Sequence, residues 1–478
     1  MDKQKMIEAL AKIVGEDQVI TDEQAILDAS KDYIGFRRYE RDDGAVLVPR
    51  AACVVRVKNT EEVSEVLKYL NAEKIDLVPR TGGSSVTQSI EPVEGGVILD
   101  GSEMNGIIEV NEEDMLVTVK CGTPLEYLET YLNKMGYTTG HFPQSYPLAQ
   151  IGGLIATRSI GQFSTLYGGI EDLVVGLEAV LADGSIVRIK NVPRRSVGPD
   201  LRHLFIGSEG LLAFITEASL KIFKYEPENR WMKAYGVVGM KNGLAFIREF
   251  MTAGYKPAVV RLNDPFEVSE LMGGIAPEGH CLLLLLAEGP AGITKAIGEG
   301  IEAIAEKYNP VDLGTKPVEH WLVHRNDVCD DMDKPIYHDM GLICDTCEIS
   351  ANWSQIGHIY DAVLERLPKE LDNLAYEGGH SSHSYINGTN IYFQFGINMT
   401  ERTAEDARND YMTVINVIME ETLKRGGSIA HHHGSGKYRA KYMPQEHGSS
   451  YQLMYRLKEA MDPNGIFNRG VLLVDKKA

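Results

Sequence analysis

Apolar and polar residues alternate along the first half of the chain with the periods of short strands and helices. Residues 53–57 are β-rich, and Asn59 then begins a helix with Glu62 at the reciprocal capping position. Residues 77–80 form a second strand, and residues 177–189 are two apolar strands joined by the hairpin signal Asp183-Gly184. We therefore expect this part to be α+β, with much antiparallel pairing.

Beyond a charged stretch at residues 224–230 the predicted elements become longer. One set has strands near Tyr235 and at 258–262 and 281–286, with helices at 243–251 and 293–308. A second set begins near Gly341, with strands around Cys344 and at 391–396, and helices at 356–367 and 404–423. The pattern predicts two βαβ-like halves that share one sheet, after a boundary near Tyr225.

Composition narrows the functional classes. The chain has 478 residues and a formal charge of −20, which disfavours nucleic acid and anionic lipid as partners. The longest apolar run, residues 281–287, is too short to span a bilayer, and residues 1–13 are a charged amphipathic helix rather than a signal peptide. The six scattered cysteines are typical of a reducing compartment, so we expect a cytoplasmic protein.

Glycine is abundant, with 47 residues, and four glycine loops lie between residues 79 and 216. In the first, Gly82 and Gly83 precede Ser84 and Ser85 and can present backbone amides and hydroxyls to an anion such as a pyrophosphate. Taken alone, this loop is more often a plain turn, and it matches neither GxGxxG nor a P-loop. The other loops are at residues 150–157, 168–174 and 207–216.

The order of these four loops resembles the PCMH-type flavin-binding domain of the vanillyl-alcohol-oxidase superfamily, over residues 46–225. The resemblance implies bound FAD, held without a covalent link because the first loop contains no His. It places a first group at the pyrophosphate: Pro79, Arg80, Thr81, Gly82, Gly83, Ser84 and Ser85. It places a second group near the isoalloxazine and diphosphate (Pro143, Ser145, Gly152, Gly153, Thr157 and Ser159) and a third near the adenosine (Glu209, Gly210 and Ile215), with Asn468 of the C-terminal tail added to the set.

The most unusual motif is His431-His432-His433-Gly434-Ser435-Gly436-Lys437, which reads as a metal tract, a tag or a catalytic cluster. Neighbouring side chains on extended backbone face opposite sides, so we expect one or two of the imidazoles to face substrate and the rest to be structural. Together with residues 159–175, 260–265 and 386–393, the motif resembles the alkylglycerone-phosphate synthase branch of the same superfamily. The resemblance implies that Tyr392 acts on the substrate's proton, that His431, His432 and His433 lie beside the flavin, and that Arg261 is functionally important.

Two positions depart from that branch. Lys334 stands where the branch has an Arg for the substrate phosphate, and Asn390 stands where it has a Cys. The neighbouring 2-hydroxy-acid dehydrogenase branch binds a metal through two His and a Glu. Here His383 matches the first ligand, but Tyr392 and His432 replace the others, so we expect no metal.

Cys344 and Cys347 form a lone CxxC. On a strand this spacing puts the two thiols on opposite faces, so we expect two buried thiols; a metal site with His380 and His383 is the alternative.

These observations predict four segments: an N-terminal helical segment (1–45), a PCMH-type FAD-binding domain (46–225), a ferredoxin-like antiparallel cap domain (226–430) and a segment that returns to the FAD site (431–478).

The predicted function is an FAD-dependent oxidoreductase that moves hydride from a small hydroxylated, anionic substrate to flavin N5, with Tyr392 and the His cluster in proton transfer and Arg261 or Lys334 near the anion. The alternatives are an alkylglycerone-phosphate synthase without net redox change and an electron-transfer flavoprotein without a small-molecule substrate. Oxygen, a quinone or an electron-transfer flavoprotein is the expected acceptor, and a homodimer is left open.

Overall fold

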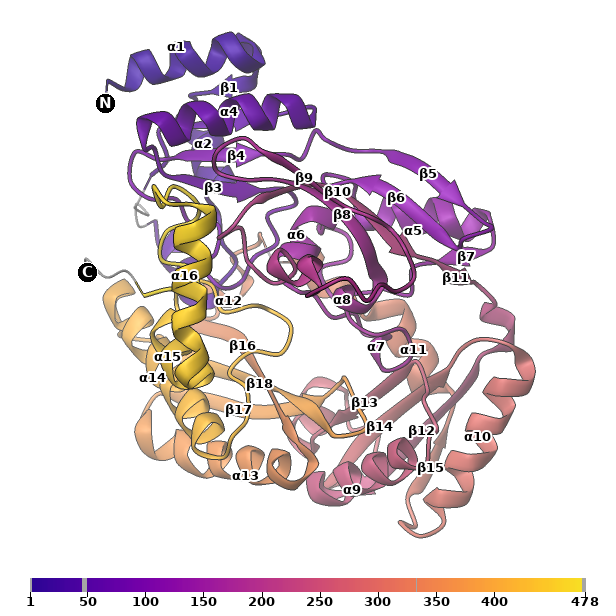
Figure 1. Ribbon diagram of the computed structural model, residues 1–478. Coiled ribbons are helices and arrows are strands. Elements are labelled where there is room, and N and C mark those ends of the chain that lie inside the picture. Colours follow the sequence, from indigo (N-terminus) through magenta and orange to yellow (C-terminus); the bar gives the residue numbers. More distant parts are fainter. Residues whose placement is uncertain (1, 45–49, 332, 475–478) are drawn as a thin grey trace.

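The computed structural model describes residues 2–44, 50–331 and 333–474 (Figure 1). The strands of the first half lie at the top of Figure 1 and one large sheet lies at the bottom. The boundary expected at residue 45 falls among residues 45–49, outside the described residues, and the other boundaries stay predictions. The fold is α+β, as the alternation of strand and helix patterns predicted.

A four-stranded sheet carries the first glycine loop. Its strand order is β1 (Val19–Ile20), β2 (Cys53–Arg56), β4 (Val97–Asp100), β3 (Leu77–Arg80), with β2, β4 and β3 parallel. Helices α1 (Lys3–Val14) and α4 (Thr60–Glu73) pack here through a shared apolar cluster. Asn59 caps α4 and accepts from the Glu62 amide at 2.8 Å, which confirms the predicted helix start.

A five-stranded antiparallel sheet follows. Its order is β5 (Ile107–Asn111), β6 (Leu116–Lys120), β10 (Phe214–Lys221), β8 (Val174–Val180), β9 (Ile186–Ile189). The β8–β9 pair is the hairpin predicted at Asp183-Gly184. Four helices lie between these strands in the chain: α5 (Leu125–Lys134), α6 (Ile151–Ala156), α7 (Ser164–Tyr167) and α8 (Ile170–Leu173). Strands β7 (Tyr137–Thr138) and β11 (Phe223–Lys224) form a separate pair.

The lower half contains a seven-stranded antiparallel sheet. Its order is β15 (Val311–Gly314), β12 (Trp231–Val238), β14 (His280–Ala287), β13 (Val259–Asn263), β17 (Leu374–Ser381), β18 (Gly388–Asn398), β16 (Leu342–Asn352). Helices α9 (Gly239–Thr252), α10 (Ala291–Ala305), α13 (Trp353–Glu370) and α14 (Ala404–Lys424) lie along its lower face in Figure 1. Two helical halves therefore do share one sheet, although strands β15 and β17 were not anticipated.

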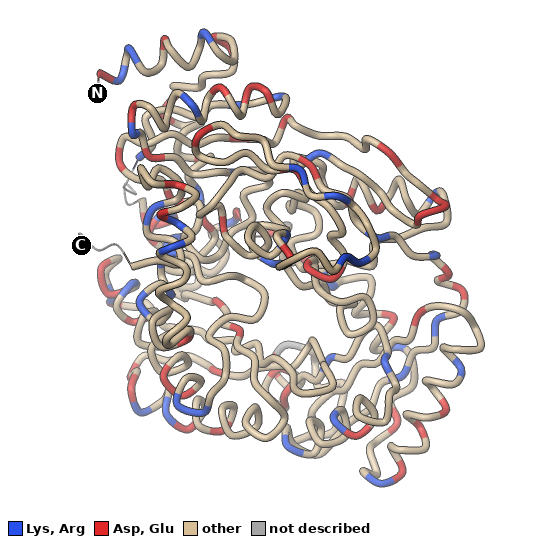
Figure 2. The backbone as a smooth tube through the Cα atoms, viewed as in Figure 1, with Lys and Arg blue, Asp and Glu red and all other residues tan. Residues whose placement is uncertain are grey.

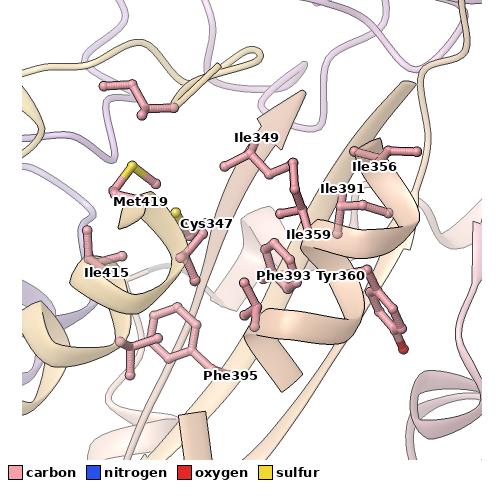
Figure 3. Packing of buried hydrophobic residues seen from close by; sticks show 14 of the residues in the cluster. Cys347, Ile349, Ile356, Ile359, Tyr360, Ile391, Phe393, Phe395, Ile415 and Met419 are labelled. Atoms are coloured by element: carbon pink, nitrogen blue, oxygen red, sulfur yellow. The ribbon is translucent and has the colours of Figure 1, made fainter. Parts of the chain in front are cut away.

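The core beneath this sheet explains which side chains remain for chemistry. Ile391, Phe393 and Phe395 of β18 pack with Ile349 of β16 against α13 and α14 (Figure 3). Since successive side chains of a strand face opposite sides, the intervening Tyr392 and Gln394 lie on the upper face, toward the first half of the chain. Core packing thus fixes the direction in which Tyr392 points.

Both ends of the described chain connect the halves. Helix α3 (Gly35–Asp42), which follows α2 (Glu23–Ala29), packs on α14 and β16, and Phe36 is buried in the lower core. Helices α11 (Lys316–His324) and α12 (Ile336–Asp339) complete the lower half, and α15 (Met443–His447) and α16 (Tyr451–Met461) lead into the C-terminal tail. The tail reaches back to β3, where the Leu77 amide donates to the Ile466 carbonyl at 2.7 Å.

Charged residues occur mainly on the outer helices and loops, while the segments that face one another across the middle carry few of them (Figure 2). Among the described residues, no helix combines the length and the apolar character required to cross a bilayer.

Candidate functional site

A first cavity lies among the glycine loops, beside the end of β3 and the start of α6. It encloses about 1000 Å³ of empty space, part of it open to solvent. Every residue that the resemblance assigns to FAD lines this cavity except Pro143, which lines a second, adjoining cavity. The structure therefore brings together three of the four glycine loops, those at residues 79–86, 150–157 and 207–216, and adds Asn468 from the tail, whereas the loop at residues 168–174 does not line this cavity.

The groups that line the first cavity fit a diphosphate-containing cofactor. None of the backbone amides of residues 82–86 donates a hydrogen bond within the described part of the chain. Three buried polar atoms of the lining, Arg80 Nε, Gln150 Oε1 and Asn468 Oδ1, also lack a partner among the described residues. Because buried polar groups are almost always paired, this set of donors and acceptors indicates a polar ligand.

Close backbone approach explains why glycine stands at the narrowest points. A Cβ atom on Gly82 would lie 2.5 Å from the Leu148 carbonyl oxygen, so no side chain fits there. Gly210 has φ +71°, and its Cβ would lie 2.9 Å from the Pro79 ring. These positions keep the loops close enough to line one narrow cavity.

Glu209 connects the first cavity to the histidine motif. Its buried carboxylate accepts from the Ser435 amide at 2.7 Å and from the Gly436 amide at 2.8 Å. Burial raises the pKa of this carboxyl to about 7. Asn468 donates to the Glu209 carbonyl at 2.7 Å, so both residues hold loops in place as well as lining the cavity.

The second cavity lies on the upper face of the seven-stranded sheet and encloses about 1400 Å³, part of it open to solvent. Strands β13, β16, β17 and β18 supply its floor, including Arg261, Thr346, His380 and Tyr392. Six residues line both cavities: Ser84, Val86, Ser145, Ser159, His432 and His433. A ligand of the first cavity can therefore present one end to the second.

Tyr392 lies beside this junction, because its ring contacts the rings of His432 and His433. Its ring stacks on His432, with centroids 5.5 Å apart and planes at 9°, and on His380 at 4.8 Å. Thr346 donates to the Tyr392 oxygen at 2.9 Å, so the phenol proton remains available to a group in the cavity. Burial raises the pKa of Tyr392, which keeps it protonated at neutral pH.

The three adjacent histidines wrap around one buried carboxylate. The amides of His431, His432 and His433 donate to Glu348 Oε1 at 3.2, 3.3 and 3.0 Å, and Arg439 pairs with Glu348 Oε2 at 2.8 Å. Arg439 and the other partners hold the pKa of Glu348 well below its usual range despite complete burial. The loop is thereby fixed with His432 and His433 toward the cavities, while His431 lines neither.

Arg261 belongs to a buried charged group at the β13 end of the floor. Its Nη2 lies 3.3 Å from His380 Nδ1, and the same nitrogen of His380 lies 2.7 Å from Glu267 Oε1. Arg261 Nε has no partner among the described residues, and burial lowers the pKa of this guanidinium. The cavity thus contains a cation with an unused donor.

Lys334 is not brought to the site. It lines neither cavity, lies on the surface and pairs with Asp331 at 2.7 Å, with more than half of its side chain exposed. The expectation that Lys334 lies near a substrate anion finds no support in its position. Lys334 instead lines a separate crevice beside α3.

His383, His431 and His432 offer nitrogen atoms within 4.8 Å of one another. These nitrogens already bond one another or neighbouring hydroxyls, with His431 Nδ1 2.9 Å from His432 Nδ1 and His383 Nδ1 2.8 Å from Ser164 Oγ. The expectation of no metal therefore stays a prediction. Cys344 lines the second cavity and Cys347 lies in the core (Figure 3), on opposite faces of β16, so only Cys347 is fully buried.

Sequence reasoning missed the contribution of the N-terminal segment. Tyr33 and Arg38 line the second cavity, and Arg38 donates to the Cys344 carbonyl at 2.8 Å. Asp32 accepts from the Ser85 hydroxyl at 2.7 Å, directly behind the first glycine loop. No local motif marks these residues, because their roles arise only when α3 packs on the lower half.

Two family matches divide the chain. Residues 51–190 match the FAD binding domain family, and residues 227–472 match the C-terminal domain of the FAD linked oxidases. An uncharacterized FAD-linked oxidoreductase of Escherichia coli, YgcU, is 46% identical over 480 residues and covers 99% of both chains. The mitochondrial D-lactate dehydrogenase [cytochrome] of Arabidopsis thaliana is 27% identical over 480 residues, covering 97% of this chain and 80% of that one.

Solved structures agree with the fold. An alkyldihydroxyacetonephosphate synthase superposes with a TM-score of 0.80 at 22% identity, covering 97% of this chain and 84% of that chain. A p-cresol methylhydroxylase gives a TM-score of 0.75 at 16% identity, covering 99% and 97%. Both neighbours confirm the fold that the glycine loops implied.

Proposed function

This chain belongs to the FAD-linked oxidases and is an FAD-dependent oxidoreductase, and on that premise we propose that it oxidises a small hydroxylated anion in the second cavity. When bound, FAD would supply the oxidising chemistry, as an acceptor for the hydride of the carbon that carries the hydroxyl. The observation that carries the proposal is the junction, where His432 and His433 line both cavities and His432 stacks on Tyr392.

Two residues at the junction are suited to different roles in proton transfer. Tyr392 is a neutral phenol whose proton is not used by Thr346, so it is suited to donate a hydrogen bond to the substrate oxygen. His432 is a neutral imidazole, because burial lowers its pKa well below the usual range, and a neutral imidazole can accept the hydroxyl proton. We therefore assign Tyr392 to orientation and polarisation, and His432 to the base.

Arg261 supports an anionic substrate. Its guanidinium lies in the cavity floor with an Nε that has no partner among the described residues, whereas the formal charge of the whole chain, −20, opposes anions. A substrate carboxylate would accept a charge-assisted hydrogen bond from this guanidinium. The relative named D-lactate dehydrogenase supports a 2-hydroxy acid as the substrate class.

The synthase reaction ranks second. It needs a cation for a substrate phosphate, and Lys334, the residue expected there, pairs with Asp331 outside the cavity. Arg38 also lines the cavity, and its Nε likewise has no partner among the described residues, but its Nη2 donates to the Cys344 carbonyl and lies 3.9 Å from Asp345. These contacts favour the oxidation of a small acid over the exchange of an acyl chain for a fatty alcohol.

The test is anaerobic reduction of the bound flavin. Purified yellow protein is mixed with a panel of D- and L-2-hydroxy acids and neutral alcohols, and the flavin absorbance is followed. We expect one class of 2-hydroxy acid to bleach the flavin, while alcohols without a carboxylate do not. Bleaching by neutral alcohols alone would remove the role of Arg261, and no bleaching together with acyl-to-alkyl exchange would favour the synthase.

The acceptor and the assembly belong to the same proposal. Oxygen, a quinone or an electron-transfer flavoprotein can each be offered to the reduced protein, and the one that restores the yellow colour fastest is the acceptor. Sedimentation of the holoprotein decides between a monomer and a homodimer.

A further inference from the structure

Oxidation of an alcohol leaves a proton that must leave the cavity, and a hydrogen-bonded network leads away from it. Resting on the proposed function, we propose that His431, Ser164 and Tyr385 form a proton exit behind His432 and His383. In this step the substrate O–H bond breaks and an N–H bond forms on His432, while the hydride and its electron pair go to the flavin. The displaced proton then passes outward through the network.

The first branch runs through the histidine motif. His432 Nδ1 lies 2.9 Å from His431 Nδ1, and His431 Nε2 lies 2.8 Å from the Tyr385 hydroxyl. His432 lines both cavities, whereas His431 and Tyr385 line neither, so the bonds lead from the junction to its far side. An imidazole can accept a proton on one nitrogen while it releases another from the opposite nitrogen, which is what a relay requires.

A second branch leads from His383 toward the same phenol. His383 lines the second cavity, and its Nδ1 lies 2.8 Å from the Ser164 hydroxyl of α7. Burial raises the pKa of the Tyr385 phenol, and the neighbouring Ser164 hydroxyl lowers it. His432 is thus joined to the phenol by hydrogen bonds through His431, and His383 is hydrogen-bonded to Ser164, which lies beside the same phenol.

The far end of the network lies near acids and solvent. Tyr385 is half-buried and is followed by Ile386, which is 70% exposed. Glu171 and Asp172 of α8 face the Tyr385 phenol. Glu348 and His433 face His431 from the other side, and Arg261 and His380 face His383. The carboxylates on the Tyr385 side therefore attract a proton electrostatically, whereas the cavity side presents a cation and imidazoles.

The relay fixes the tautomers of the two linked imidazoles. His432 must carry its proton on Nδ1, so that Nε2 can accept from the substrate, and His431 must then carry its proton on Nε2 and donate to Tyr385. In the opposite arrangement Tyr385 would donate to His431, and His432 would carry a proton on Nε2 and could not act as the base. The two arrangements are chemically distinct.

The first experiment needs no substrate. Holoprotein labelled with ¹⁵N-histidine is studied by NMR, with Tyr385→Phe used to assign the His431 signals. The proposal expects His432 as the Nδ1–H tautomer and His431 as the Nε2–H tautomer, and it expects the His431 signals to shift in Tyr385→Phe. The reverse tautomers, or a metal ion bound in stoichiometric amount at these histidines by elemental analysis, would overturn it.

The second experiment uses the hydroxy acid that bleaches the flavin fastest. Tyr385→Phe is expected to retain FAD and to slow bleaching at least about 10-fold, with the loss recovered by a small diffusible base such as imidazole. Tyr308→Phe, which removes a phenol bonded to Glu249 far from the network, is the matched control and should not respond to imidazole. An unchanged rate in Tyr385→Phe, or a loss that no added base recovers, would contradict the exit. If no acid bleaches the flavin, the proposed function fails, while the tautomers still decide the network.

Discussion

The two adjoining cavities are built from different materials. The first is lined by backbone amides and glycines of loops, each continuous in sequence. The amides of residues 82–86 have no partner in the described part of the chain, and Gly82 is too close to Leu148 for a side chain. The second is lined by side chains that point from strands β13, β16, β17 and β18. The difference shows how a strongly acidic chain can hold a dianionic cofactor: backbone amides bind anions without any net charge. The substrate side instead depends on single side chains.

The titratable groups of the two cavities differ in the same way. Burial raises the pKa values of two carboxyls at the first cavity to about 7: Asp32, which lies behind its first glycine loop, and Glu209, which lines it. Imidazoles of the second, His383 and His432, have pKa values lowered well below the usual range by burial. Around neutral pH the first set is changing its charge, whereas the second stays neutral and ready to accept a proton.

The largest expected effect comes from adding a side chain at the first cavity where two backbone segments approach most closely. Gly82→Ala places a Cβ against the Leu148 carbonyl, and overpacking of this kind costs about 1–3 kcal/mol, which corresponds to roughly 5-fold to 150-fold weaker FAD binding. FAD content after purification and titration of the apoprotein measure it. Gly292→Ala, at a glycine with open space around it, is the control and should bind FAD normally. Equal FAD affinity in both variants would refute the amide cradle.

The next effect is confined to the second cavity. Tyr392→Phe removes the phenol proton that polarises the substrate oxygen, and flavin reduction should slow by about 10²-fold while FAD content is unchanged. Rapid anaerobic mixing gives the rate. Loss of FAD in this variant would mean that Tyr392 also contributes to FAD binding in the first cavity. An unchanged rate of flavin reduction would mean that the histidines alone carry out proton transfer.

Arg261→Gln separates binding from chemistry. It removes the guanidinium but keeps a polar side chain, so we expect KM for the acid to rise by about 10-fold to 100-fold, because a charge-assisted hydrogen bond is lost. Steady-state kinetics over a range of acid concentrations measures the change, and Arg261→Lys should recover part of it. A fall in kcat with an unchanged KM would place Arg261 in the chemical step instead.

The smallest effect concerns pH. The pKa of Asp32 is raised to about 7 by burial, so its carboxyl is mainly neutral below that pH and ionised above it. The carboxyl accepts a hydrogen bond from Ser85, a residue of the first glycine loop. The ionised form repels a pyrophosphate, so FAD should bind a few-fold more weakly at about pH 8 than at about pH 6. Glu91, Arg37 and Lys437 also face this region.

The variant Asp32→Asn tests whether Asp32 causes the pH dependence of FAD binding. This variant should lose a large part of the pH dependence, and what remains belongs to Glu209, whose pKa is also raised to about 7. FAD release followed by its fluorescence is the measurement. A variant with the full pH dependence of the parent chain would show that Asp32 is not its source.

The same contrast explains what the sequence could predict. Loops such as residues 79–86 are continuous in sequence, so their order carried the resemblance from which the fold and the FAD-lining residues were predicted. Tyr392 and Arg261 were also predicted only through resemblance, since a single Tyr or Arg on a strand carries no local signal. Arg38, Asp32 and Tyr385 were missed because their contacts arise from tertiary packing. Lys334 lines neither cavity, since a matching position in the chain does not ensure a matching position in space.

The central claim is that FAD in the first cavity oxidises an acid held in the second. The most direct measurement is anaerobic bleaching of the holoprotein by the best 2-hydroxy acid, compared with the same acid deuterated at the carbon that carries the hydroxyl. The account predicts full bleaching that is slower with the deuterated acid, and formation of one equivalent of the 2-oxo acid per FAD. A flavin that stays oxidised with every hydroxy acid, while the protein exchanges an acyl for an alkyl chain, would contradict it.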